Sequence, residues 1–289
     1  FPEPEAVLGI VAGAKPRSLL FCREKNEERE TWDGFRFGPA GAGERFRFDE
    51  THPIAELDAK LTELLGDQPA LYYPVGADPE WDARAMGWLN AVRAKARTGL
   101  GAPERVQDVR ALVDEMRLVK DAHELEVMRR AASISAGAHQ RAIRAARPGR
   151  FEYELEAELL YEFRRRGAQF PAYWPIVAGG ANACVLHYVS NDDVLRDGDL
   201  VLIDAGCELA GYASDITRSF PVGPRFSAAQ RAVYDIVLAA QAAAIGKTKA
   251  GNAWNEPHDA AVRVLAQGMR DLVAHHHRHL VVGELEFVQ

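Results

Sequence analysis

Asp204 and Asp215 have the spacing of a paired-carboxylate site. Asp204 ends the run Leu200–Ile203, which is typical of a strand buried on both faces, where a carboxylate is rare without a partner. If Leu209 and Ala210 form the centre of a hairpin loop, Asp204 lies directly opposite Asp215, with Cβ atoms about 4.5–5.5 Å apart. Two carboxylates at this distance repel each other unless they share a proton or bind a cation. A cation fits better, because carboxylates bridge metals about 3.5–4 Å apart in dinuclear hydrolases.

A purely structural role for the two aspartates stays open. Asp204 could cap a turn, while Asp215 could pair with Arg218. A one-residue change in loop register would also place the two side chains on opposite faces of the sheet. The spacing alone therefore leaves both interpretations standing.

Three other patterns are weaker candidates for chemistry. Gly179-Gly180 could form an anion-binding nest, although a turn is the simpler interpretation. The histidine-rich tract 275–279 is expected to be solvated and to bind metal only adventitiously. Arg164–Arg166 ends a predicted helix, where cations face the helix dipole favourably. The sequence contains no Ser-His-Asp arrangement, phosphate loop or dinucleotide fingerprint.

The elements that must position these residues form two predicted domains, 1–110 and 111–289. In the first, short strands alternate with amphipathic helices, which indicates a small α/β domain. Its expected elements are a hairpin (6–11 and 18–22), helices 53–65 and 81–97, strand 70–75 and a loop or irregular edge over 34–48. In the second, Asp121-x-x-Glu124 and Ser227-x-x-Gln230 are helix-start signals. Its expected elements are helices 125–146, 153–166, 227–245 and 259–274, with strand segments 174–178, 185–189, 200–204 and 212–222.

Composition excludes several classes of protein. Thirty-five Lys and Arg against 42 Asp and Glu give a net charge of −7, which does not suit nucleic acid or an anionic membrane surface. No stretch approaches the ~18–20 apolar residues of a membrane span. The three cysteines form no CxxC pair, which argues against a disulfide framework and a thiolate zinc site and indicates a cytoplasmic protein.

The residues around the aspartates resemble those of a known family. The matching segments are Leu186-His187-Tyr188, Arg196–Gly206, Gly211-Tyr212, Asp215–Arg218 and Phe220–Val222, with Glu115–Lys120 upstream. They are similar to the creatinase-type, or "pita-bread", metallopeptidases, and within that group to bacterial Xaa-Pro aminopeptidases (aminopeptidase P). The resemblance covers nearly the whole chain.

The resemblance implies an α+β fold, with a small α/β N-terminal domain followed by a pita-bread catalytic domain. It also implies two divalent metal ions, usually Mn²⁺, held by two Asp, one His and two Glu. Asp204 and Asp215 match the two aspartates, with Asp215 bridging. His187 matches a substrate-contacting catalytic histidine, Tyr173 a tyrosine that lines the site, and Trp32 a tryptophan that approaches a neighbour's site in oligomers.

The implied reaction removes the N-terminal residue from peptides with proline second, through a hydroxide activated by two metals. A homo-oligomer is expected. The chain departs from the family where it opens at Phe1 and ends at Gln289, before the matching His and both Glu, so we expect a truncated chain that is inactive by itself. The alternatives are an Xaa-Pro dipeptidase (prolidase) and a non-catalytic peptide-binding or assembly module. A methionine aminopeptidase fits less well.

Overall fold

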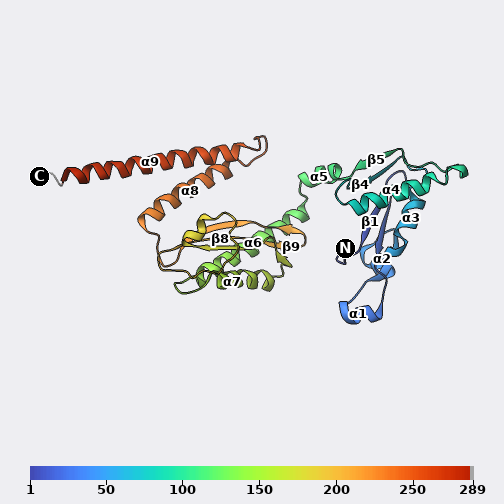
Figure 1. Ribbon diagram of the computed structural model, residues 1–289, viewed down its shortest axis with the longest axis horizontal. Helices are drawn as coiled ribbons and strands as arrows, with labels where there is room; N and C mark the ends of the chain where they lie inside the picture. Colours follow the sequence, from blue (N-terminus) through green and yellow to red (C-terminus); the bar gives the residue numbers. More distant parts are fainter. Residues whose placement is uncertain (287–289) are drawn as a thin grey trace. The chain divides into compact units, whose positions relative to one another are not determined.

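The computed structural model describes the backbone of residues 1–286 and the side chains of residues 1–274. The chain divides into two compact units, Phe1–Val119 and Lys120–Gln289. Each unit combines helices with strands, so the α+β class is confirmed (Figure 1). Within the described residues, we find no helix whose length and hydropathy would let it cross a membrane.

The first unit contains two small sheets. β1 (Val7–Val11) pairs antiparallel with β2 (Arg17–Cys22), which confirms the predicted hairpin, and β2 pairs in parallel with β3 (Glu50–Pro53). β4 (Ala70–Tyr73) pairs in parallel with β5 (Arg105–Asp108). The core contains Leu19, Phe21, Leu57, Trp88 and Val92. The helices of this unit are α1 (Glu27–Asp33), α2 (Gly38–Phe46), α3 (Leu57–Leu64), α4 (Pro79–Arg93) and α5 (Arg110–Leu118), with short 3-10 helices at Ile54–Glu56 and Ala96–Thr98.

Helix α2 corrects the expectation of a loop or irregular edge over 34–48. The segment is rich in glycine, which disfavours helix. Pro39 occupies the first turn, where its missing N–H costs nothing. Ala42 is fully buried and packs in one cluster with Leu20 and Cys22 of β2. Tertiary packing therefore outweighs the intrinsic preference of this segment.

The second unit places two helices against a sheet. α6 (Ala122–Ala145) starts at the predicted capping box, in which the Glu124 amide donates to Asp121 Oδ1 at 2.8 Å and the Asp121 amide donates to Glu124 Oε2 at 2.6 Å. α6 and α7 (Glu152–Arg165) lie side by side (Figure 1). The sheet has the strand order β11-β8-β7, and its strands are β7 (Ile176–Gly179), β8 (Leu200–Ala205) and β11 (Ile216–Pro221).

The two faces of β8 differ in burial. Val201, Ile203 and Ala205 are fully buried and share one core with α6 and α7. Leu200, Leu202 and Asp204 alternate with them and are only half-buried. The expectation of a strand buried on both faces is therefore wrong, because an apolar run does not report which face is covered. Asp204 lies on the more open face.

The predicted strand over 185–189 is also wrong. This stretch follows a short 3-10 helix, Gly180–Cys184, and forms no described strand. Val185, Leu186 and Val189 are 54%, 89% and 57% exposed. Their β-branched and apolar types favour strand, but no described strand pairs with them. The segment is a loop.

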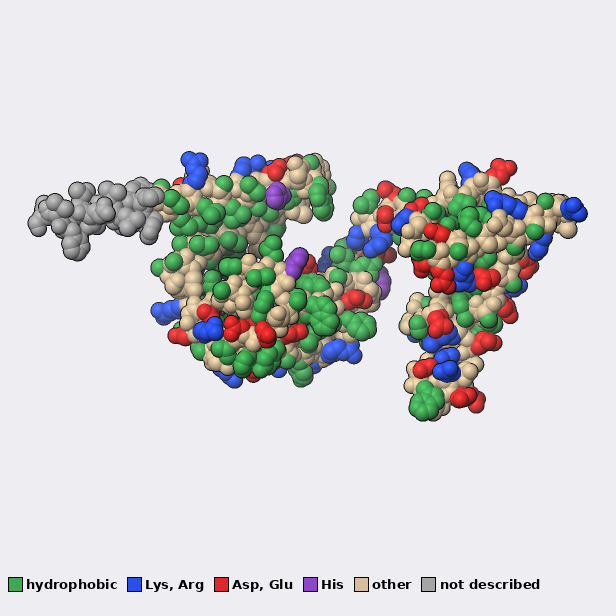
Figure 2. All heavy atoms as spheres, in the orientation of Figure 1, with side chains coloured by type: hydrophobic (Ala, Val, Ile, Leu, Met, Phe, Trp, Pro, Cys, Tyr) green, Lys and Arg blue, Asp and Glu red, His purple; other side chains and the backbone are tan. Residues whose placement is uncertain are grey.

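Helices α8 (Ala228–Lys247) and α9 (Glu256–Glu286) pair with each other. α8 starts at the predicted capping box of Ser227 and Gln230. Apolar side chains remain exposed along both helices, as Figure 2 shows over this region. The exposed set comprises Val233, Val237, Leu238, Ile245, Val262, Met269 and Val273.

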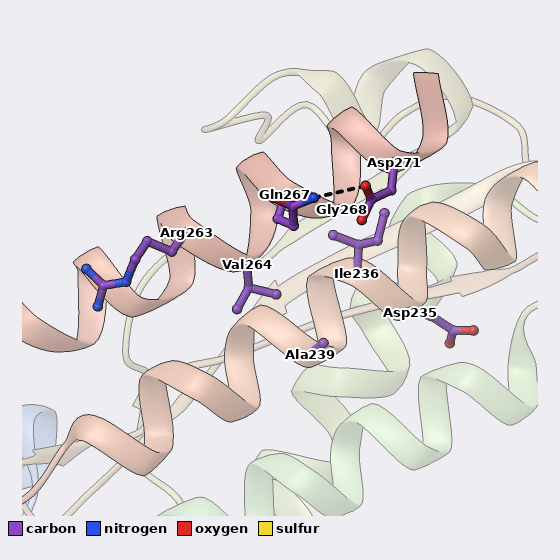
Figure 3. A pocket seen from close by; sticks show the side chains of 8 residues that line it. All are labelled: Asp235, Ile236, Ala239, Arg263, Val264, Gln267, Gly268 and Asp271. Atoms are coloured by element: carbon purple, nitrogen blue, oxygen red, sulfur yellow. Dashed lines mark hydrogen bonds between the residues drawn. The ribbon is translucent and has the colours of Figure 1, made fainter. Parts of the chain in front are cut away.

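A groove of about 530 Å³ runs between α8 and α9. Figure 3 shows Ile236 and Ala239 of α8 on the side that faces Val264 of α9. The helices approach closely at Gly268, where an added Cβ would lie 2.6 Å from Ile236 Cγ2. Ile236, Ala239 and Val264 give the groove an apolar part, and its other lining side chains, those of Asp235, Arg263, Gln267 and Asp271, are charged or polar.

The 289-residue chain is expected to self-associate. Val233, Val237 and Leu238 are each about half exposed on α8, and fully burying one such side chain is worth about 1.5–3 kcal/mol. An exposed apolar patch of this kind drives association. Light scattering over a range of concentrations should give a mean mass that rises with concentration.

A Val233→Glu/Val237→Glu double variant should lower that mass, while Gln241→Glu adds a charge to the same helix without removing an apolar group. A monomer mass that stays constant over the concentration range would contradict the prediction.

Candidate metal centre

Asp204 and Asp215 are joined through the hydroxyl of Tyr173. Asp204 lies near the end of β8, and Asp215 directly precedes β11. Tyr173 Oη lies 2.6 Å from Asp204 Oδ1 and 3.0 Å from Asp215 Oδ1, within donating distance of both. The three side chains therefore form one cluster, as the sequence predicted for the two aspartates.

The register that brings the aspartates together differs from the predicted one. The turn is centred on Ala210 and Gly211, whose φ values are 50° and 84°, and Leu209 pairs with Tyr212 across it. Positive φ values at both central residues are typical of a two-residue hairpin turn whose twist matches that of the two strands it joins. In the continuing ladder, Asp204 lies opposite Thr217, so the expectation that it lies directly opposite Asp215 is wrong.

The shift leaves the shared face intact, so the chain does not adopt the alternative register that would place the two aspartates on opposite faces of the sheet. Moving the loop centre by one residue changes the cross-strand partner by two positions, and side chains alternate with a period of two. Asp215 therefore lies diagonal to Asp204 on the same face of the sheet. Arg218 Nη1 donates to the carbonyl of Thr217 at 2.7 Å, and none of the ion pairs in the described part of the chain joins Asp215 to Arg218.

Tyr173 remains a hydrogen-bond donor at neutral pH. Partial burial, with the Asp204 and Asp215 carboxylates beside it, raises the pKa of the Tyr173 phenol well above its usual range. A neutral hydroxyl offers one proton to two carboxylates that would otherwise repel. The Asp204 and Asp215 carboxylates therefore concentrate negative charge at one point on the open face of the sheet, which favours the binding of a cation.

The described hydrogen bonds of this cluster include no other predicted site residue. His187 is exposed on the loop that follows the 3-10 helix Gly180–Cys184. His187 takes no part in the described hydrogen bonds that join Tyr173 to the two aspartates. Trp32 lies on α1 in the first unit and is 81% exposed. The side chains of the histidine-rich tract 275–279 lie outside the described residues.

The donor set fits a hard divalent cation in part. Carboxylate oxygens suit manganese and magnesium. Among the residues that the structure describes, no group of three or more His, Cys, Asp and Glu side chains could hold a metal ion. Asp204 and Asp215 can therefore supply two ligands of a centre that needs more.

Glu152 was missed by sequence reasoning. It stands in the first turn of α7, where an acidic residue is explained by the helix dipole alone. In the structure it is fully buried and contacts the loop that carries His187. The available signal was the Gly179-Gly180 pair, of which the Gly179 amide donates to this carboxylate.

Comparison with known proteins shows clear similarity along both units. Residues 126–287 match metallopeptidase family M24, and residues 1–72 match the aminopeptidase P N-terminal domain. The Xaa-Pro aminopeptidase of Escherichia coli is 42% identical over 93% of this chain and 62% of its own length. That of Haemophilus influenzae is 40% identical over 94% of this chain and 61% of its own length.

Solved structures agree with these matches. The structure of Pseudomonas aeruginosa aminopeptidase PepP has a TM-score of 0.91 and 50% identity, covering 94% of this chain and 62% of that one. A zinc-substituted E. coli aminopeptidase P in complex with product has a TM-score of 0.90 and 42% identity, with coverage of 94% and 62%. The chain thus spans less than two thirds of the length of these relatives.

Proposed function

The chain belongs to metallopeptidase family M24, and we propose that it serves the removal of the N-terminal residue from peptides whose second residue is proline. The observation that carries the proposal is the Asp204–Tyr173–Asp215 cluster, in a chain 42% identical to the Xaa-Pro aminopeptidase of E. coli. We assign the two aspartates as ligands of divalent metal, with Mn²⁺ as the proposed ion. A cytoplasmic location and a homo-oligomer are parts of the same proposal.

The chain's own residues have separate tasks in this proposal. Bound divalent metal would polarise the scissile carbonyl and lower the pKa of attacking water. Tyr173 holds one oxygen of each aspartate and so orients both carboxylates. His187 donates a hydrogen bond to the substrate carbonyl oxygen, where negative charge develops during attack. Tyr173 and Trp32 are proposed to contact the substrate.

The experiment measures release of the N-terminal residue by the protein that carries this chain, with and without Mn²⁺. The substrates are an Xaa-Pro tripeptide, its alanine analogue at the second position and the Xaa-Pro dipeptide. Release should require Mn²⁺ and proline, and it should be lost in Asp204→Asn and Asp215→Asn. Cleavage of the dipeptide alone would indicate a prolidase, and binding without cleavage would indicate a non-catalytic module.

The 289-residue chain by itself is expected to bind Mn²⁺ weakly, because its described residues offer two carboxylates and no third ligand. Isothermal titration should show no saturation at equimolar Mn²⁺. The Asp204→Asn/Asp215→Asn variant serves as the blank for binding elsewhere. Two tight ions per chain, lost in that variant, would contradict the prediction and would show that another copy supplies ligands.

A further inference from the structure

The backbone amides at the two ends of the segment Gly179–Asp193 donate hydrogen bonds to the same carboxylate, that of Glu152. The segment leaves the sheet at the end of β7 and carries His187. The Gly179 amide donates to Glu152 Oε1 at 2.6 Å, and the Asp193 amide donates to Glu152 Oε2 at 3.0 Å. The Glu152 amide in turn donates to the Asp193 carbonyl at 3.0 Å. Both ends of the segment are therefore held at one residue of α7.

Two side chains inside the segment bond to the same carboxylate. Asn182 Nδ2 donates to Glu152 Oε1 and to the Tyr188 hydroxyl, each at 3.1 Å. The Tyr188 hydroxyl donates to Glu152 Oε2 at 2.8 Å. Burial and the Glu152 carboxylate raise the pKa of Tyr188 to about 12, so this hydroxyl keeps its proton at neutral pH. Glu152, Asn182 and Tyr188 form a closed ring of hydrogen bonds directly beside His187.

The Glu152 carboxylate is built into this position. Its side chain is fully buried, and its four partners are all donors, which suits an acceptor-only carboxylate. Hydrogen bonds to a charged acceptor are stronger than those between neutral groups. The ring therefore rigidifies the segment as long as every donor is satisfied.

The two glycines allow the backbone to approach. A Cβ at Gly179 would lie 2.7 Å from Leu195 Cδ2 and 3.4 Å from Glu152 Oε1. Gly180 has φ +55°, which a side chain would disfavour. The Gly179 amide thus donates to an anion of the same chain, and Gly180 provides the backbone conformation that follows it.

We propose that Glu152 is a positioning residue that fixes the segment 179–193 and thereby sets where His187 meets the substrate. The role of His187 in this inference rests on the proposed function. The fixing of the segment rests on the five hydrogen bonds of Glu152 alone, four to its carboxylate and one from its amide. The two parts can therefore be tested separately.

The first test is hydrogen–deuterium exchange of the 289-residue chain. Glu152→Gln should raise exchange within 179–193 by roughly tenfold or more, because the amide donors at both ends lose a charged acceptor. Exchange in α6 and β8 should stay unchanged. Glu158→Gln removes the same charge from the same helix, where Glu158 pairs with Arg141, and should leave the segment protected.

Tyr188→Phe removes one donor from the segment's side of the ring and gives a second, milder probe. It should raise exchange in the same segment by a smaller factor, and it covers the case in which Glu152→Gln fails to fold. Unchanged exchange in the segment would overturn the proposal. Faster exchange throughout the second unit would do so as well, because it would show a general loss of stability.

The second test is a kinetic cycle on the protein that hydrolyses the Xaa-Pro tripeptide. Glu152→Gln should lower kcat more than it raises KM, and combining it with His187→Ala should add no further loss. Additive losses would refute positioning through His187. If the peptidase reaction itself is absent, the proposed function fails while the exchange result still decides whether Glu152 fixes the segment.

Discussion

Gly206→Ala is expected to destabilise the second unit by about 3 kcal/mol or more, among the larger effects of single substitutions. Gly206 lies between β8 and β9 (Cys207–Leu209), and an added Cβ would lie 1.6 Å from the Ser214 carbonyl oxygen and 3.1 Å from the Asp215 amide. These are backbone atoms, which cannot rotate away. Relief requires movement of the strand that carries Asp215. Urea unfolding followed by circular dichroism measures the loss.

Gly211→Ala is the matched control for this variant. Unlike Gly206, Gly211 adopts a positive φ, of 84°, and no atom lies within 4 Å of its added Cβ. Its cost should be limited to conformational strain, about 1–2 kcal/mol. Equal unfolding midpoints for the two variants would show that the contact at Ser214 yields easily, against the prediction.

His187→Ala is expected to lower kcat by about 10²–10³-fold and to change KM little, in the protein that hydrolyses Xaa-Pro peptides. The size follows from losing one hydrogen bond to the oxygen that becomes negative in the transition state. The reason to test this residue is its place in the Leu186-His187-Tyr188 match and on the segment held by Glu152. Steady-state kinetics with an Xaa-Pro tripeptide separate kcat from KM.

His123→Ala provides the control, because His123 is an exposed histidine in the first turn of α6. It should leave both constants unchanged. If His187→Ala also leaves them unchanged, the histidine is an ordinary surface residue and its proposed role is wrong.

Local signals in the sequence predicted most helices well. Asp121-x-x-Glu124 and Ser227-x-x-Gln230 form the hydrogen bonds of a capping box. Helix α6 starts at the residue after Asp121, and α8 starts at the residue after Ser227. These signals work because the cap and the first turn lie within four residues of each other. The aspartate pair was also predictable, since both residues lie in one hairpin.

Features set by distant residues were not predictable. The helix α2 depends on packing of Ala42 against β2, about twenty residues away. The turn centre at Ala210 was misplaced because alanine gives no sign of its positive φ. Glu152 bonds to Asp193, 41 positions along the chain, and its place in a helix start gave it an ordinary explanation. For α2 and Glu152 the deciding contact is non-local, whereas the turn depends on the backbone conformation of Ala210 itself.

The double attachment of the segment 179–193 has an evolutionary consequence. Because Gly179 and Asp193 are brought together by Glu152, a change in the length of the stretch between Asn182 and His187 is expected to leave the sheet undisturbed. Closing a flexible loop costs only about 0.6 kcal/mol more for each doubling of its length. Insertions between Asn182 and His187 are therefore expected to leave the two aspartates in register, while they would displace His187 from its fixed position.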